Sequence, residues 1–320
     1  MSYQKISGLV LKRLASGLVT LFIVSILVFL GTEILPGDVA QAALGQQATP
    51  EAVQALRDQL GIDKPAISRY LEWLSGFAQG DLGQSMVSGQ EISDLIGPRL
   101  EKTLFLAGAA ALIAIPLSIG LGLLAALYEG SIVDKGISST TLVFVSLPDF
   151  LLGYLLLLIA AVKLGWFPAL SKFSDGMSLS EQIHTVALPC LTLALAVSAH
   201  TMRLTRSAVL SVMSQAYIEM AILKGASRRR VILLHALPNA LSPILNIVML
   251  TLAFLIVGVV VVEAVFNYAG MGRLMIDAVS KRDMPMVQAC GLIFASVYVF
   301  LNLAADILSL LTNPRRRKPK

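Results

Sequence analysis

The amino-acid sequence predicts an all-α integral membrane protein with six transmembrane helices, and three observations lead to this prediction. Hydrophobic residues make up 56% of the 320-residue chain and charged residues only 14%, whereas soluble domains carry about 25% charged residues. The apolar residues form six runs, each long enough to cross a bilayer as a helix of about 20 residues. Lysine and arginine are concentrated at one side of these runs, as the positive-inside rule requires.

The six predicted spans are separated by segments that contain charged residues, glycine or proline. Pro116 predicts a kink in the second span, and Pro148 interrupts the third, because proline lacks the N–H group that a helix needs. The spans are Leu14–Thr32, Thr103–Tyr128, Gly136–Val162, Thr185–Met202, Leu241–Val262 and Met286–Leu311.

The positive charges predict which side of the membrane each end faces. Both termini are predicted to be cytoplasmic, and the net charge of +5 is interpreted as a topology signal, not as affinity for nucleic acid. The basic residues at the predicted inner ends are Lys5, Lys12, Arg13, Lys135, Arg203, Arg206, Lys224, Arg228–Arg230 and those of the C-terminal tail.

One long polar segment, Leu35–Lys102, follows the first span. Two helices are predicted within it, an amphipathic one that begins at Pro50 and is capped by Gly61, and a second short one over Ile67–Phe77. Its composition leaves two roles open. The segment either packs on the membrane surface or forms an extracytoplasmic lobe that meets a delivery protein or covers a pathway.

A charged loop, Gln215–Ala240, lies between the fourth and fifth spans. Its first half predicts a short helix, because residues recur along one face at three- and four-residue spacing. Gly225 is expected to end or bend this helix. A rigid helix of this kind suits the groove of a partner protein. The residues of the predicted face are Tyr217, Met220, Ala221 and Lys224.

The order of residues in this loop resembles a family signature. The permease subunits of binding-protein-dependent ABC importers carry an E-A-A, then G, then L-P pattern on the loop that docks the ATPase. Met220 replaces the middle alanine here, and His235 stands where an isoleucine is usual. The resemblance implies an ATPase-coupling loop that includes Tyr217 together with the five matching residues Glu219, Ala221, Gly225, Leu237 and Pro238.

Other segments resemble the peptide-type branch of these permeases, the dipeptide, oligopeptide, nickel and glutathione group, and within it the first of two paired permeases. The resemblance covers nearly the whole chain. It implies a type I ABC importer permease fold with a helical extracytoplasmic lobe after the first helix, in the bacterial plasma (inner) membrane. The matching segments are Leu35–Asp38, Leu56–Pro65, Gly80–Gly83, Leu164–Trp166, Arg203–Arg206 and Val262–Phe266.

The resemblance also implies partners and a division of the chain. The partners are a second homologous permease subunit, two cytoplasmic ATPase subunits that use ATP and Mg²⁺, and an extracytoplasmic solute-binding protein. Residues 1–102 are expected to hold the first transmembrane helix and the lobe. Residues 103–312 form a five-helix permease core with a cytoplasmic coupling loop at residues 211–240, and residues 313–320 form a basic cytoplasmic tail.

No motif in the chain predicts catalysis or a bound cofactor. The sequence has no G-x-x-x-x-G-K-[S/T] phosphate loop and no G-x-S-x-G nucleophile elbow. The three histidines do not have metal-site spacing, and Cys190 and Cys290 are expected to be buried thiols. We therefore expect a pore-forming subunit that is not an enzyme, has no metal and has no ATPase site of its own.

Polar residues inside the spans are candidates for a translocation pathway, because ionisable groups in a membrane are costly and usually face a cavity. Asp149 follows Pro148 in the third run and would attract a cationic or amino-bearing solute. Alternatively, the third helix starts later and leaves Asp149 shallow or paired. Asn246 in the fifth span is a second candidate, whereas Asp306 and Asn302 are expected to bond to neighbouring helices.

These features predict the permease subunit of an ATP-driven importer that translocates di- or oligopeptides, or related small solutes, delivered by a binding protein. One alternative is a secondary transporter driven by an ion gradient, which would work without partners. A second is a non-transporting scaffold or receptor subunit. The solute itself is left open.

Overall fold

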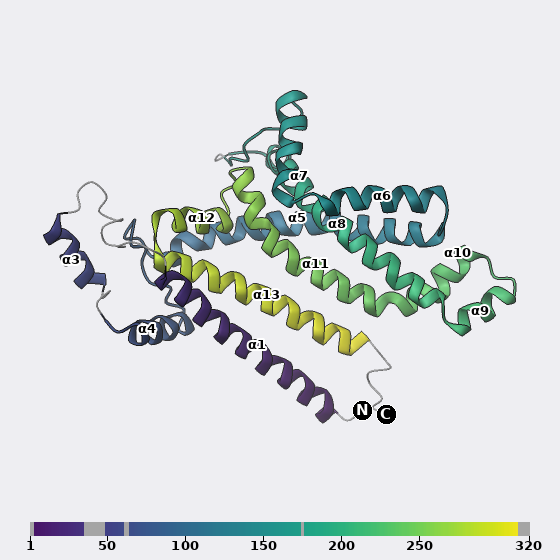
Figure 1. The fold of residues 1–320 in the computed structure, drawn as a ribbon, viewed down its shortest axis with the longest axis horizontal. Helices are drawn as coiled ribbons and strands as arrows, with labels where there is room; N and C mark the ends of the chain where they lie inside the picture. The colour runs from purple at the N-terminus through teal and green to yellow at the C-terminus, as the bar shows by residue number, and fades with distance from the viewer. Residues whose placement is uncertain (1–2, 35–48, 61–63, 174–175, 313–320) are drawn as a thin grey trace. The chain divides into compact units, whose positions relative to one another are not determined.

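The structure is a computed structural model, and it describes residues 3–34, 49–60, 64–173 and 176–312. The regular elements formed by these residues are helices (Figure 1), so the all-α prediction is confirmed. The Leu35–Asp38 motif, Gly61 and the basic tail 313–320 lie outside the described residues.

Among the residues that the structure describes, five helices are long and apolar enough to cross a membrane. They are α1 (Tyr3–Glu33), α5 (Ile92–Leu127), α8 (Leu179–Met213), α11 (Leu237–Val265) and α13 (Met284–Thr312). A sixth span is counted if a bent pair of helices crosses as one unit. The helices that contain the second and fourth predicted spans begin before Thr103 and Thr185, because polar residues extend α5 and α8 beyond their apolar runs.

The predicted third span is broken into two helices that differ in direction by 103°. α6 (Ile132–Ser146) ends at Leu147, and α7 (Asp149–Leu156) continues into the π-helical turn η2 (Leu157–Lys163). Leu147 is extended, with ψ of 128°. The cause is Pro148, which cannot donate to a helix and disfavours helical backbone at the residue before it.

The chain forms two compact units. The first is formed by the described residues within Met1–Leu14, Phe105–Tyr268 and Phe300–Lys320, and the second by those within Ala15–Leu104 and Ala269–Val299. The boundary that the sequence predicts between residues 102 and 103 falls inside α5. The predicted division of the chain into domains therefore stays a prediction.

In the first unit, α11 packs on α8 and on α7, and α6 packs on α8. Small side chains allow these helices to approach closely. A Cβ atom placed on Gly153 of α7 would lie 3.3 Å from Val265, and the hydroxyls of Thr201 and Thr251 join α8 to α11 at 2.7 Å. Cys190 on α8 is a buried free thiol, as predicted.

The second unit includes the short helices that the sequence predicts after the first span, α3 (Pro50–Leu60) and α4 (Ala66–Ala78). α4 packs on α1, where the rings of Phe29 and Tyr70 meet edge to face at 5.3 Å and the Tyr70 hydroxyl bonds Ser25 at 2.8 Å. Cys290 of α13 is a buried free thiol in a core with Ile92 and Met271, the first residue of α12 (Met271–Lys281).

Candidate functional site

The charged loop folds as a short helix followed by a long one. α9 (Ala216–Leu223) is the helix expected from the spacing of its residues, and it follows α8 after two residues. The single turn α10 (Arg228–Arg230), the π-helical turn η3 (Val231–Ala236) and α11 then form one continuous helical stretch. Pro238 lies just after η3, and a π-helical turn is a usual response to a proline that leaves a carbonyl without a donor.

Gly225 ends α9 with a left-handed turn, as the sequence predicts. Its φ is +82°, a value that costs a residue with a Cβ atom about 1–2 kcal/mol. Gly225 N donates to the Ile222 carbonyl at 2.9 Å, and Ala226 N donates to the Ala221 carbonyl at 3.2 Å. These two bonds define a Schellman motif, which fixes the direction in which the chain leaves the helix.

One face of α9 anchors the helix to its own unit. Ile218 is fully buried, and it forms a small core with Val231 and Ala236 of η3. Val212 and Met213 at the end of α8 pack against this core. Ile218 thus joins α9 to the end of α8 and, through η3, to the start of α11.

The other face of α9 presents apolar side chains to the outside. Tyr217, Met220 and Leu223 are exposed by 42%, 54% and 74%. Ala221, which the sequence places on the same face as Tyr217 and Met220, instead packs on the Ile218 core, so the predicted face is wrong at this residue. An eight-residue helix spans about two turns, too few for spacing alone to fix its buried side.

The remaining residues of the predicted coupling loop have separate positions. Glu219 is exposed in the first turn of α9, where a negative charge favours the helix dipole. Leu237 packs on the core around Val209 and Ile232, and Pro238 is exposed beside it. Leu237 and Pro238 therefore belong to the start of α11 and not to the exposed face of α9.

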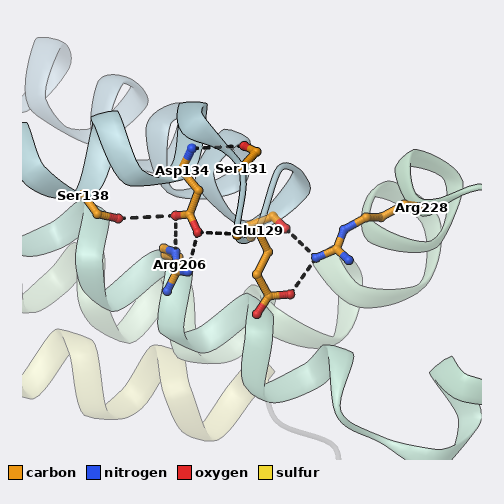
Figure 2. A network of polar contacts seen from close by, with 8 residues as sticks. Glu129, Ser131, Asp134, Ser138, Arg206 and Arg228 are labelled. Atoms are coloured by element: carbon orange, nitrogen blue, oxygen red, sulfur yellow. Dashed lines mark hydrogen bonds and ion pairs between the residues drawn. The ribbon is translucent and has the colours of Figure 1, made fainter.

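A polar network near α9 was not predicted from the sequence (Figure 2). Both carboxylate oxygens of Asp134, in the first turn of α6, accept bonds from the Arg206 guanidinium of α8 at 2.8 Å. Asp134 is 7% exposed and also accepts from Gly130 N and the Ser138 hydroxyl. Such a two-pronged arginine–carboxylate pair fixes orientation as well as distance. It holds the start of α6 on α8.

The same network extends to the residues after α9. Arg228 of α10 donates from Nη2 to Glu129 Oε2 at 2.7 Å and to the Ala126 carbonyl at 3.1 Å (Figure 2). Ala126 is in the last turn of α5. The sequence signal for this network was weak, because Arg206 and Arg228 also fit the positive-inside rule and their partners are far away in the sequence.

A cavity of about 370 Å³ lies between α7, α8 and α11. Asp149, the first residue of α7, lines it, and the structure gives this carboxylate no hydrogen bond or ion pair with any residue that it describes. His200, Thr201, Thr251 and Phe254 supply other parts of the lining. The cavity is thus largely apolar, with one carboxylate.

The other polar candidates differ from Asp149. Asn246 is exposed on α11 and is not part of the cavity lining. Asp306 forms an ion pair with Arg13 at 2.8 Å, which confirms that it bonds to a neighbouring helix. Within the described ranges, no three His, Cys, Asp or Glu side chains group as metal ligands.

Comparison with known proteins identifies the family to which the chain belongs. The family described as "Binding-protein-dependent transport system inner membrane component" matches residues 118–318, and its N-terminal counterpart matches residues 7–107. The chain therefore belongs to the binding-protein-dependent transport system inner membrane components. It is the permease component of an ABC importer, in which ATP is hydrolysed by separate subunits.

Individual relatives agree with this class. The glutathione transport system permease proteins GsiC of Escherichia coli K12 and Shigella dysenteriae serotype 1 are 37% identical over 308 residues, which cover 96% of this chain and 98% of theirs. A solved structure of the MetNI methionine ABC transporter, facing inward, aligns with a TM-score of 0.53 at 17% identity. The alignment covers 68% of this chain and 96% of the transporter chain. At this identity the likeness shows a shared fold and nothing more.

Proposed function

We propose that this chain is the first of two homologous permease subunits in a bacterial inner-membrane importer of short peptides or related solutes. Two cytoplasmic ATPase subunits with ATP and Mg²⁺, and an extracytoplasmic binding protein, complete the complex. Both termini lie in the cytoplasm, and α3 and α4 belong to an extracytoplasmic lobe. The glutathione permeases among the relatives support a peptide-like solute, since glutathione is itself a short peptide.

The observation that carries the coupling proposal is the two-sided character of α9. Tyr217, Met220 and Leu223 leave a large apolar surface exposed on a helix whose opposite side is locked by Ile218. An amphipathic helix that lays an apolar face into a groove is a common mode of recognition. We assign the groove to the ATPase, because α9 lies in the segment that matches the family's docking loop.

Movement of the ATPase subunits then displaces α9, and α9 transmits the displacement to the helices that it contacts. Because Ile218 packs on Val212, Met213 and Val231, a displaced α9 carries the end of α8 and the start of the α11 stretch with it. These two helices line the cavity with Asp149. ATP-driven closure of the ATPase pair thereby exchanges inward access for outward access.

The cavity is proposed as part of the solute pathway, with Asp149 as the group that attracts a positively charged amino group. Short peptides and glutathione each carry an α-ammonium group, which a carboxylate in apolar surroundings attracts more strongly than one in water. Asn246, whose side chain is exposed on α11, is proposed to contact the solute at another point of the pathway.

The test is reconstitution of the chain in vesicles with candidate permease, ATPase and binding-protein partners. We expect ATP hydrolysis and peptide uptake that need all components. Leu223→Asp places a charge on the docking face and should abolish co-purification of the ATPase. Gly225→Val strains the end of α9 and should leave membrane insertion intact but abolish coupling.

Two results would contradict the proposal. One is uptake by the chain alone under a proton or sodium gradient, which would make it a secondary transporter. The other is unchanged ATPase binding in Leu223→Asp together with normal uptake in Gly225→Val, which would show that α9 is not the docking element.

A further inference from the structure

The residues just after α9 contact the end of α5 and the turn that follows it. Arg228 bonds both the Ala126 carbonyl and the Glu129 carboxylate (Figure 2). The Ala126 carbonyl is one of the last four of α5, which have no N–H partner within the helix. A cation at this end also favours the helix dipole. Arg228 therefore binds the end of α5 by hydrogen bond and by charge.

The turn that Arg228 contacts is held by several hydrogen bonds. Ser131 N donates to the Tyr128 carbonyl at 2.9 Å, and Gly130, with φ of +79°, donates from its N–H to Asp134. The Ser131 hydroxyl caps α6 by accepting from Asp134 N. Asp134 is in turn held by Arg206 of α8. A displacement applied to Glu129 is thus passed to α6 without being absorbed by a loose loop.

Arg228 is the member of the basic triplet that makes this connection. Arg229 and Arg230 are exposed, and their side chains form no hydrogen bond or ion pair among the described residues. Arg228 and Glu129 are about half exposed, at 46% and 47%. An ion pair this exposed contributes little to the stability of the fold. Its role is therefore to fix the position of the two segments that it joins.

We propose that Arg228 and Glu129 are positioning residues that transmit movement of the α9 segment to α5 and α6. This inference rests on the proposed function, because it needs α9 to be the element that the ATPase moves. Ile218 transmits the movement of α9 to the end of α8 and the start of α11. The Arg228–Glu129 pair transmits the same movement to the turn between α5 and α6. The helices on both sides of the turn then move as one body with α8.

The experiment uses the complete complex in vesicles with its binding protein and a dipeptide probe. Arg228→Gln, Glu129→Gln and the double variant remove the connection, Arg228→Lys keeps the charge, and Arg229→Gln is the control with the same loss of charge one residue away. Three quantities are measured: co-purification of the ATPase, ATP hydrolysis stimulated by the loaded binding protein, and dipeptide uptake per ATP hydrolysed.

We expect uptake per ATP to fall about fivefold or more in Arg228→Gln and Glu129→Gln, which is the lower end of typical coupling between sites. The double variant should lose no more than either single variant, because both break the same connection. Arg228→Lys should recover part of the loss. ATPase co-purification should stay at the wild-type level in all variants, since neither residue is on the exposed face of α9.

The inference is overturned if Arg228→Gln and Arg229→Gln have the same uptake per ATP, or if the double variant shows the sum of two independent losses. Loss of ATPase co-purification in Arg228→Gln alone would also overturn it, because the residue would then be part of the docking face. Failure of the wild-type complex to couple uptake to ATP would instead contradict the proposed function.

Discussion

Gly122 of α5 lies so close to Thr205 of α8 that a Cβ atom at Gly122 would come within 2.8 Å of the Thr205 Cβ. The same atom would be 2.9 Å from the Met202 carbonyl oxygen, which belongs to the backbone. These separations are shorter than any ordinary contact between such atoms. The crossing of α5 and α8 therefore depends on the absence of a side chain at residue 122.

Gly122→Ala should accordingly destabilise the permease by about 1–3 kcal/mol, the usual cost of an overfilled core. Gly120→Ala is the matched control, because a Cβ atom there meets nothing within 4 Å and alanine is the better helix former. The measurement is the folded fraction of the purified permease after heating, followed by size-exclusion chromatography. Equal heat resistance of the two variants would contradict the close crossing.

Arg206→Gln should destabilise the first unit. It leaves the Asp134 carboxylate, 7% exposed, without its cationic partner, which is itself 28% exposed, and loss of a hydrogen bond to a charged group costs about 1.5–3 kcal/mol. Asp134→Asn combined with Arg206→Gln should recover part of this loss, since neither charge then remains. Thermal stability of both variants checks the expectation. A double variant less stable than Arg206→Gln would show that the pair does not act as a unit.

Asp149→Asn should lower uptake of a dipeptide with a free amino group by about tenfold, the effect of losing one charge interaction of about 1–2 kcal/mol. An N-acetylated dipeptide that the binding protein also accepts should be taken up at a similar rate by variant and wild type. Asp94→Asn makes the same change on α5 outside the cavity lining and serves as control. Equal loss for both peptides would mean that Asp149 does not select for the ammonium group.

The spans could be predicted from the sequence because a helix that lies in a membrane consists of a long apolar run. Such a run can be recognised within one segment, without knowledge of the residues that it contacts. The turn at Gly225 could be predicted for a similar reason, since glycine directly after a short helix commonly adopts the left-handed conformation that ends it. The sequence predicted only that Pro148 interrupts the third span, and not the 103° bend between α6 and α7. A proline breaks a helix but does not determine the direction of the helix that follows.

What the sequence did not predict depends on contacts between distant residues. Asp134 and Arg206 are in different helices, and each also suits a local role, Asp134 in the first turn of a helix and Arg206 as a topology signal. The buried side of α9 is set by Ile218 meeting Val231 after the chain has turned back at Gly225. Neither arrangement leaves a periodic signal in one segment.

The two cysteines have a practical consequence. Cys190 and Cys290 are 4% and 0% exposed, so thiol-specific reagents should leave the native chain unmodified. A single cysteine introduced on the exposed side of α9 would then be the one reactive thiol, and a fluorophore or spin label could be attached there without first replacing native residues. The movement of α9 during a transport cycle could be followed directly in the otherwise unaltered protein.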